Sequence, residues 1–144
     1  MPVIMLIGAV GCGKSTFCRA IEGLVPLEKK TQAIEVLGNA IDTPGEYLEN
    51  PRLHRALAAT AAQVDVVLLM QSCVGNGGHF PPGFAWMFGE KPVYGVISKT
   101  DIAYTKEDIE KAEATLRFAG ASKIFPVSAQ TGQGLNLLQE ELLP

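Results

Sequence analysis

The chain has 144 residues, of which 47% are hydrophobic and 19% are charged, and its formal net charge is −3. This composition excludes wholesale disorder, and the length fits one domain, so we expect residues 1–144 to form a single domain with a buried core. The 12 basic residues form no dense run, which argues against general binding to nucleic acid or to an anionic membrane.

Short apolar runs alternate with helical stretches along the chain. The apolar run 3–7 is bounded by Gly8 and predicts a strand buried on both faces. Gly38-Asn39 is a two-residue hairpin signal, and Thr105 with Asp108 three residues later predicts the start of a helix. In chain order we expect strand 3–7, helix 14–23, strands 33–37 and 40–42, helix 51–63, strand 64–70, a glycine-rich loop 72–80, a short helix 81–88, strand 92–98, helix 106–118, strand 123–127 and helix 135–143.

This alternation of strands and helices predicts the fold class. We expect an α/β three-layer sandwich, in which helices cover both faces of a six-stranded, mostly parallel sheet. The hairpin in 33–42 should add one antiparallel edge strand. Because ligands of such sheets bind at the carboxyl ends of the strands, functional residues should lie in the loops that follow the strands.

The cysteines and the start of the chain bear on its location. Cys12, Cys18 and Cys73 form no CxxC pair and no Cys/His cluster, a usage typical of a reducing cytosol rather than of a zinc site. The apolar N-terminus lacks a basic leader and a continuous apolar stretch of about 18 residues. We therefore expect a cytoplasmic protein without an export signal or a membrane span.

Residues 8–15, GAVGCGKS, match the phosphate-binding pattern GxxxxGK[ST] between a predicted strand and a predicted helix. Glycines let backbone N–H groups surround a phosphate, and the helix N-terminus adds its positive dipole. Lys14 should contact the β- and γ-phosphate oxygens, and Ser15 should bind Mg²⁺. The predicted phosphate-binding residues are Gly8, Ala9, Val10, Gly11, Cys12, Gly13, Lys14, Ser15 and Thr16.

Two later loops have the residues expected to distinguish guanine from adenine. Residues 98–101, SKTD, are similar to the pattern [NT]KxD, with a serine in place of the usual asparagine or threonine. The carboxylate of Asp101 can accept hydrogen bonds from the guanine N1–H and 2-amino groups, which adenine does not offer there. The N–H of Ala129, after the last strand, should meet the guanine carbonyl. The predicted base-binding residues are Ser98, Lys99, Asp101, Ser128 and Ala129.

A third motif is expected to detect the γ-phosphate. Residues 42–45, DTPG, match DxxG at the end of a predicted strand. Asp42 should hold Mg²⁺ through water, and the N–H of Gly45 should bond the γ-phosphate, because only glycine permits so close an approach.

In the order GxxxxGKS, Thr, DTPG, SKTD, VSA, these motifs resemble the small P-loop GTPase fold. The resemblance implies that Thr31 closes on Mg²⁺ when a triphosphate is bound, and that Glu46 stands where many GTPases have a water-orienting glutamine. A carboxylate there repels the γ-phosphate, so we expect slow GTP hydrolysis. The predicted catalytic residues are Lys14, Thr31, Gly45 and Glu46, and the predicted metal ligands are Ser15, Thr31 and Asp42.

Longer stretches resemble the ethanolamine- and propanediol-utilisation P-loop family. They include 30–33, 41–47, 50–52, 80–85 and 123–128, so the resemblance runs nearly end to end. It implies a bacterial cytosolic protein associated with the shell-enclosed microcompartments that degrade these small molecules. Its implied cofactors are Mg²⁺ and GTP or GDP, and its implied partners include shell proteins.

Three functions stay open at this point. The first is a slow GTPase that acts as a molecular switch. The second is a small-molecule kinase, because the resembled family includes members described as acetate kinases. The third is a non-hydrolysing module that docks on a compartment shell protein. Arg52 and Arg55 are expected on a solvated helix face, with an arginine finger as the alternative, and residues 86–88 in the core or at a partner face.

Overall fold

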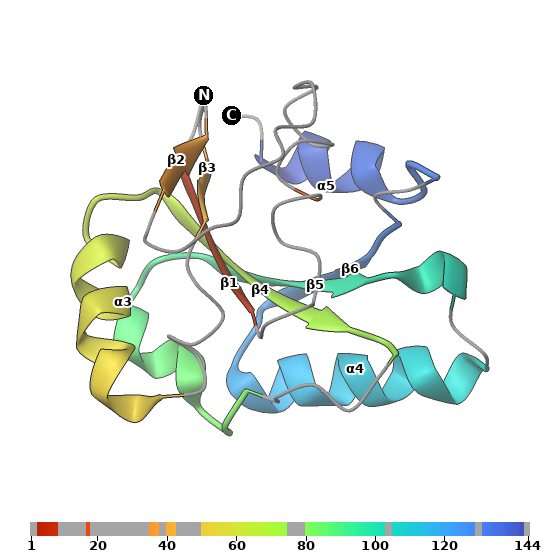
Figure 1. The fold of residues 1–144 in the computed structure, drawn as a ribbon, viewed down its shortest axis with the longest axis horizontal. Helices are drawn as coiled ribbons and strands as arrows, with labels where there is room; N and C mark the ends of the chain where they lie inside the picture. Colours follow the sequence, from red (N-terminus) through yellow and green to blue (C-terminus); the bar gives the residue numbers. More distant parts are fainter. Residues whose placement is uncertain are drawn as a thin grey trace.

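A computed structural model of the chain describes residues 3–8, 17, 35–37, 40–42, 50–74, 80–102, 105–128 and 131–142. Its sheet lies between layers of helices (Figure 1) and has the strand order β2-β3-β1-β4-β5-β6. The strands are β1 (Ile4–Gly8), β2 (Glu35–Leu37), β3 (Ala40–Asp42), β4 (Val66–Ser72), β5 (Val93–Ser98) and β6 (Lys123–Pro126). The helices are η1 (Pro51–Leu53), α3 (His54–Ala61), η2 (Phe84–Phe88), η3 (Thr100–Ile102), α4 (Lys106–Ala119) and α5 (Leu135–Leu142).

The strand pairing confirms the predicted sheet within the described residues. The pairs β3–β1, β1–β4, β4–β5 and β5–β6 are parallel, whereas β2 is antiparallel to β3. Leu37 pairs with Ala40, which leaves two residues between the paired positions, as a two-residue hairpin requires. The prediction of a mostly parallel sheet with one antiparallel edge strand is therefore confirmed.

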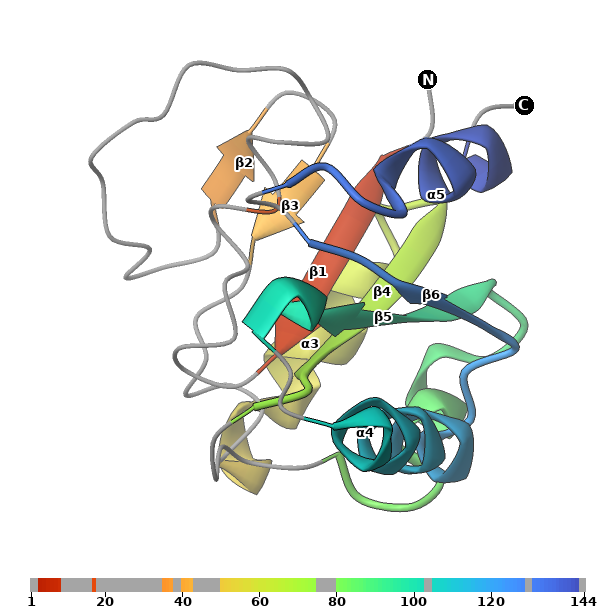
Figure 2. The ribbon, with the colours of Figure 1, turned by 90° about the vertical axis from the view of Figure 1, so that its right-hand side faces the viewer.

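Each face of the sheet has its own apolar core, which gives the three layers. Successive side chains of a strand point to opposite faces. Met5 and Ile7 of β1 therefore join the core that contains α3, η2 and α4. Ile4 and Leu6 join the second core, with Phe17 and the buried residues of α5. Figure 1 shows α3 and α4 below the sheet and α5 above it, and Figure 2 shows the same layers from the side.

Several element boundaries differ from the predicted ones. The strand predicted at 64–70 is β4, shifted by two residues, because its pairing with β1 starts at Val66. The preceding residue, Asp65, accepts the N–H of Val3 with its carboxylate at 2.8 Å. The helix predicted at 51–63 begins as the 3₁₀ turn η1 and ends as an α-helix at Ala61. The predicted helix 14–23 lies outside the described residues, apart from the helical residue Phe17. Within the described part of the chain, no helix has the length and apolarity needed to span a bilayer.

The segment predicted as core or partner face is partly buried and partly exposed. In the 3₁₀ helix η2, Phe84 and Phe88 are buried and Met87 is half-buried, but Trp86 is 84% exposed. Gly83, with a φ of +74°, lies under the Trp86 ring, and its N–H donates to the carbonyl of Phe118 at 2.8 Å. Trp86 therefore lies on the surface near the C-terminal end of α4.

Candidate functional site

The carboxyl ends of the parallel strands meet at one edge of the sheet. Ser72, the last residue of β4, pairs with Ser98, the last residue of β5. Gly8, the last residue of β1, pairs with Met70 of β4, and Asp42, the last residue of β3, pairs with Leu6 of β1. Three residues of the predicted site, Gly8, Asp42 and Ser98, are thus the final residues of neighbouring or nearby strands.

The loop after β5 is held against the loop after β6. Ser98 is buried, and Lys99 has a φ of +61°, which is unusual for a residue with a side chain. The N–H of Thr100 donates to the carbonyl of Val127 at 3.3 Å, and the N–H of Ile102 donates to the carbonyl of Lys99 at 3.1 Å. The two loops predicted to bind one ligand therefore lie side by side at the end of the sheet.

The same loop is also held from the side of β4, by a residue that sequence reasoning missed. Cys73 directly follows β4, and its N–H donates to the carbonyl of Ser98 at 3.2 Å. Its Sγ lies 3.3 Å from the carbonyl oxygen of Lys99, in the geometry of a thiol hydrogen bond. Its position after a predicted strand was the available signal, since loops at this edge carry function.

The loop after β6 closes on a buried serine. The N–H of Ser128 donates to the carbonyl of Gln133 at 2.9 Å, and its own carbonyl accepts the N–H of Gly132 at 2.8 Å. The Oγ of Ser128 accepts the N–H of Thr131 at 3.2 Å. These bonds fix the start of the loop immediately before position 129.

Two buried side-chain oxygens at this edge have no hydrogen-bond partner among the described residues. They are Oε1 of Gln71, near the end of β4, and Oγ1 of Thr100, in the loop after β5. The Gln71 Nε2 does have a partner, the carbonyl of Ser72 at 3.2 Å. Buried polar atoms are usually paired, and both atoms lie near the edge of the sheet at which ligands of parallel sheets bind.

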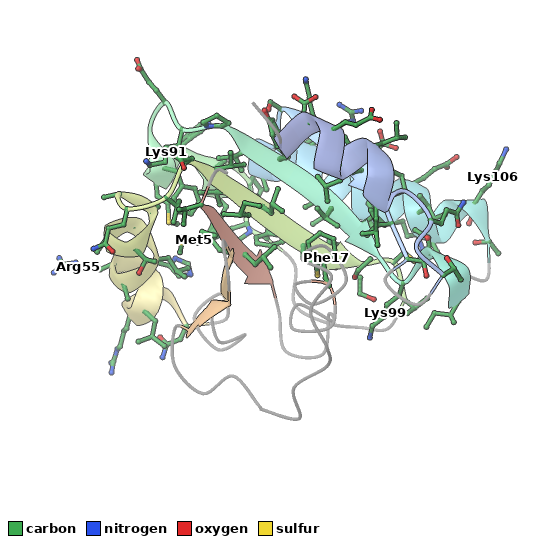
Figure 3. The ribbon with its side chains drawn as sticks, turned by 90° about the horizontal axis from the view of Figure 1, so that it is seen from above. Met5, Phe17, Arg55, Lys91, Lys99 and Lys106 are labelled. Atoms are coloured by element: carbon green, nitrogen blue, oxygen red, sulfur yellow. The ribbon has the colours of Figure 1, made fainter. Side chains whose placement is uncertain are left out.

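The remaining predicted residues divide into those placed and those outside the described residues. Asp42 and Asp101 are placed by their backbones, at the end of β3 and within η3. Arg52 and Arg55 are exposed, as a solvated helix face requires, and Figure 3 shows Arg55 projecting from α3 away from the sheet, with Lys99 at the opposite side of the view. Outside the described residues lie Ala9, Val10, Gly11, Cys12, Gly13, Lys14, Ser15, Thr16, Thr31, Gly45, Glu46 and Ala129.

The described residues contain no group of three or more His, Cys, Asp or Glu side chains that could hold a metal ion. The predicted ligands Ser15 and Thr31 are not among the described residues.

Known structures share this fold. Era of Aquifex aeolicus, in a single-residue variant bound to GDP and AlF4−, superimposes with a TM-score of 0.69 at 20% identity. The likeness covers 99% of this chain and 57% of the Era chain. The order and direction of the strands and the layers of helices thus define an α/β protein with the fold of P-loop GTPase domains.

The sequence identifies the family within this class. The family model described as "Ethanolamine utilisation - propanediol utilisation" matches residues 1–143, so the chain belongs to the PduV-EutP family. The propanediol utilization protein PduV of Citrobacter freundii is 39% identical over 136 residues, which cover 94% of this chain and 89% of that protein. The probable acetate kinase EutP of Salmonella typhimurium is 39% identical over 103 residues, 71% of this chain and 65% of that protein.

Proposed function

We propose that the chain binds a guanine nucleotide with Mg²⁺ at the carboxyl-end edge of its sheet and hydrolyses GTP slowly. The observation that carries the proposal is the bond from the Thr100 N–H to the Val127 carbonyl, which holds the two predicted base-binding loops together. Binding of GDP by Era, a protein of the same fold, supports it. The family description further supports a role with the compartments of ethanolamine or propanediol utilisation, where shell proteins are the proposed partners.

The phosphates are assigned to the loop after β1. There the backbone N–H groups of 8–16 and the ammonium of Lys14 bind the β- and γ-phosphate oxygens. Ser15, Thr31 and Asp42 are the proposed Mg²⁺ ligands, and this donor set fits the ion because Mg²⁺ prefers hard oxygen ligands. The register also fits, since Asp42 pairs with Leu6, two residues before the glycine at which the phosphate loop begins. When bound, Mg²⁺ neutralises charge on the phosphate oxygens.

The base is assigned to the loops after β5 and β6. Asp101 accepts two hydrogen bonds from guanine, and Ala129 donates its N–H to the guanine carbonyl. Lys99 lies along the base. An adenine in this site leaves the Asp101 carboxylate unpaired, which strongly favours guanine.

Hydrolysis is expected to be slow. The N–H of Gly45 and the Lys14 ammonium stabilise charge on the γ-phosphate, as phosphoryl transfer requires. Glu46 is poorly suited to orient the attacking water, because its carboxylate repels the same phosphate.

Calorimetric titration with GTP, GDP and ATP in the presence of Mg²⁺ tests the proposal. We expect GTP and GDP to bind, and ATP to bind at least about a hundredfold more weakly. Lys14→Ala should abolish tight binding of GTP, and Asp101→Asn should weaken GTP and shift preference toward xanthosine triphosphate. Asp108→Asn is a matched control, because Asp108 lies in the first turn of α4 and its amide should leave nucleotide selectivity unchanged.

The outcomes separate cleanly. Folded wild-type protein that binds none of the three nucleotides contradicts the proposal. Binding of ATP as tightly as GTP contradicts the assignment of Asp101 while leaving the phosphate loop in place.

A second candidate, an acetate kinase, is favoured by a relative. The EutP protein that is 39% identical over 71% of this chain is named a probable acetate kinase. Such an enzyme transfers the γ-phosphoryl group to a carboxylate oxygen of acetate, with the nucleoside diphosphate as leaving group. Acetyl phosphate that accumulates faster than free phosphate, with either GTP or ATP as donor, would support this candidate over the GTPase.

A further inference from the structure

The backbone of Lys99 adopts a conformation that the sequence does not favour. Its φ of +61° is a left-handed conformation that is disfavoured for any residue with a Cβ. Among the described residues, Lys99 alone combines a side chain with a positive φ. Such a conformation persists only where the surrounding structure holds it, and it is common at functional sites.

Contacts from three directions hold this residue and its neighbours. From the residue that follows β6, the carbonyl of Val127 accepts the N–H of Thr100. From within the loop, the N–H of Ile102 donates to the Lys99 carbonyl at 3.1 Å. From β4, Cys73 reaches both the Ser98 carbonyl, through its N–H, and the Lys99 carbonyl, through its Sγ at 3.3 Å.

Cys73 is well placed to act on the loop without touching a nucleotide. Cys73 is buried, with 8% of the residue exposed, and it belongs to the apolar core on the α3 and α4 face. The Lys99 carbonyl is thereby shared between the thiol and the first turn of η3, the short helix that carries Asp101. The orientation of this peptide therefore fixes the direction in which η3 leaves the sheet.

We propose that Cys73 is a positioning residue for guanine recognition, through its thiol hydrogen bond to the Lys99 carbonyl. The inference rests on the proposed function, because it assigns the loop at 98–101 to the base. Without the thiol donor, the Lys99 peptide has more freedom, and the Asp101 carboxylate meets the guanine 2-amino group less often in the correct geometry.

The simpler explanation is that Cys73 only fills the core. Serine and alanine at this position distinguish the two explanations, because both are slightly smaller than cysteine but only serine keeps a donor. Cys73→Val gives a third comparison, since valine fills the core without any donor.

The experiment compares the affinities for GDP and inosine diphosphate, which lacks the 2-amino group, so that their ratio reports the Asp101 contact. A thiol hydrogen bond is weak, so we expect Cys73→Ala and Cys73→Val to lower the ratio by about threefold to fivefold. Cys73→Ser should keep the ratio within about twofold of the wild type. Val93→Ala, at the opposite end of β5, should reduce thermal stability without changing the ratio.

Each result decides the inference. If the GDP to inosine diphosphate affinity ratio is the same in the Ala, Val and Ser variants, reduced or not, the inference is wrong and Cys73 only packs in the core. If Cys73→Ala does not fold, the ratios of the Cys73→Val and Cys73→Ser variants are compared instead, and equal ratios again contradict the inference. A wild-type protein that binds no GDP overturns the proposed function as well, whereas a wild type that prefers GDP with unchanged ratios in the variants overturns only this inference.

Discussion

At the scale of single residues, Gly134 is a position at which the loop after β6 tolerates little change. Its φ is +80°, and a Cβ there would lie 2.1 Å from the carbonyl oxygen of Pro126. Because the obstacle is backbone, the loop itself must move. We expect Gly134→Ala to lower the free energy of unfolding by about 3 kcal/mol, measured by denaturant titration.

Gly132 is the matched control for this substitution. Its φ is +83°, but a Cβ there would meet nothing within 4 Å. Gly132→Ala should therefore cost only the backbone strain, about 1 kcal/mol. Equal losses in the two variants would show that the approach of Gly134 to Pro126 contributes nothing.

Sequence motifs predicted which polar residues lie at the carboxyl-end edge of the sheet, but they did not predict the contacts that hold these residues in place. The pattern SKTD correctly placed Ser98 at the end of a strand, because strand and loop chemistry are both local. The left-handed Lys99 could not be predicted, since a side chain disfavours that conformation and only contacts with β4 and β6 impose it. Cys73 was missed for the same reason: its partner is 26 residues away.

At the scale of elements, the start of α4 shows a reciprocal cap that the sequence predicted correctly. The N–H of Thr105 donates to Oδ2 of Asp108 at 3.2 Å, and the Thr105 side chain accepts the N–H of Asp108. We expect Thr105→Ala to lower the free energy of unfolding by about 1 kcal/mol, because the cap loses its side-chain acceptor and the N–H of Asp108 keeps only the backbone carbonyl of Thr105, at 3.2 Å. Thr115→Ala within the same helix should have no destabilising effect, since alanine is the better helix former. A similar loss in both variants would contradict a specific capping role.

An ion pair at the surface joins α5 to the sheet, beside the buried contacts of Leu135 and Leu138. Lys123 of β6 lies 2.5 Å from Oε1 of Glu141 in α5, and the hydroxyl of Tyr94 in β5 donates to the same oxygen at 3.3 Å. The hydrogen bond with Lys123 lowers the pKa of Glu141 below its ordinary value of 4.5, and the same bond raises the pKa of Lys123 above 10.5.

This pair predicts the pH dependence of stability. A lowered carboxyl pKa means that the folded state binds the proton less readily, so the contribution of Glu141 is complete above the ordinary pKa and is lost as the pH falls through the folded pKa. Because the pKa of Lys123 is raised, its contribution to stability is lost as the pH rises above 10.5. We therefore expect Glu141→Gln to lower the melting temperature near neutral pH and to converge with the wild type as the pH falls below the lowered pKa of Glu141.

Glu140→Gln is the control, because Glu140 is exposed and precedes Glu141 on the same helix. It should change the melting temperature little at any pH. A difference between Glu141→Gln and the wild type that stays constant as the pH falls would contradict the role of the ion pair.

The kinds of elements were more predictable than their limits. Continuous apolar runs correctly predicted β1, β4 and β5, because strands whose residues are nearly all buried leave a continuous hydrophobic signature. The hairpin signal at 38–39 helped to predict β2 and β3, and β6 has no buried residue. The shift of β4 was not predictable from apolar residues, since the strand extends through the polar residues Gln71 and Ser72. These pair with Ile97 and Ser98 of β5. The short helix predicted at 81–88 is the 3₁₀ helix η2, Phe84–Phe88, and begins three residues later than predicted.

At the scale of the whole molecule, two regions of the described structure lie apart from each other. The carboxyl-end edge holds the loops assigned to the nucleotide. The exposed aromatic residues Trp86 and Phe118, 84% and 72% exposed, lie at the far end of α4. The sequence predicted the first region from local motifs, but it left residues 86–88 open between the core and a partner face, because exposure is decided by which helix covers which face.

The position of Trp86 has a practical consequence, since it is the single tryptophan of the chain. The 14 residues of α4 separate it from η3, a length of about 21 Å for an α-helix. An indole already in water changes its emission little on denaturation, so intrinsic fluorescence is a poor monitor of unfolding here. The same indole is a natural energy-transfer donor for a nucleotide that carries a fluorophore on its ribose, which allows occupancy to be followed on the unlabelled protein.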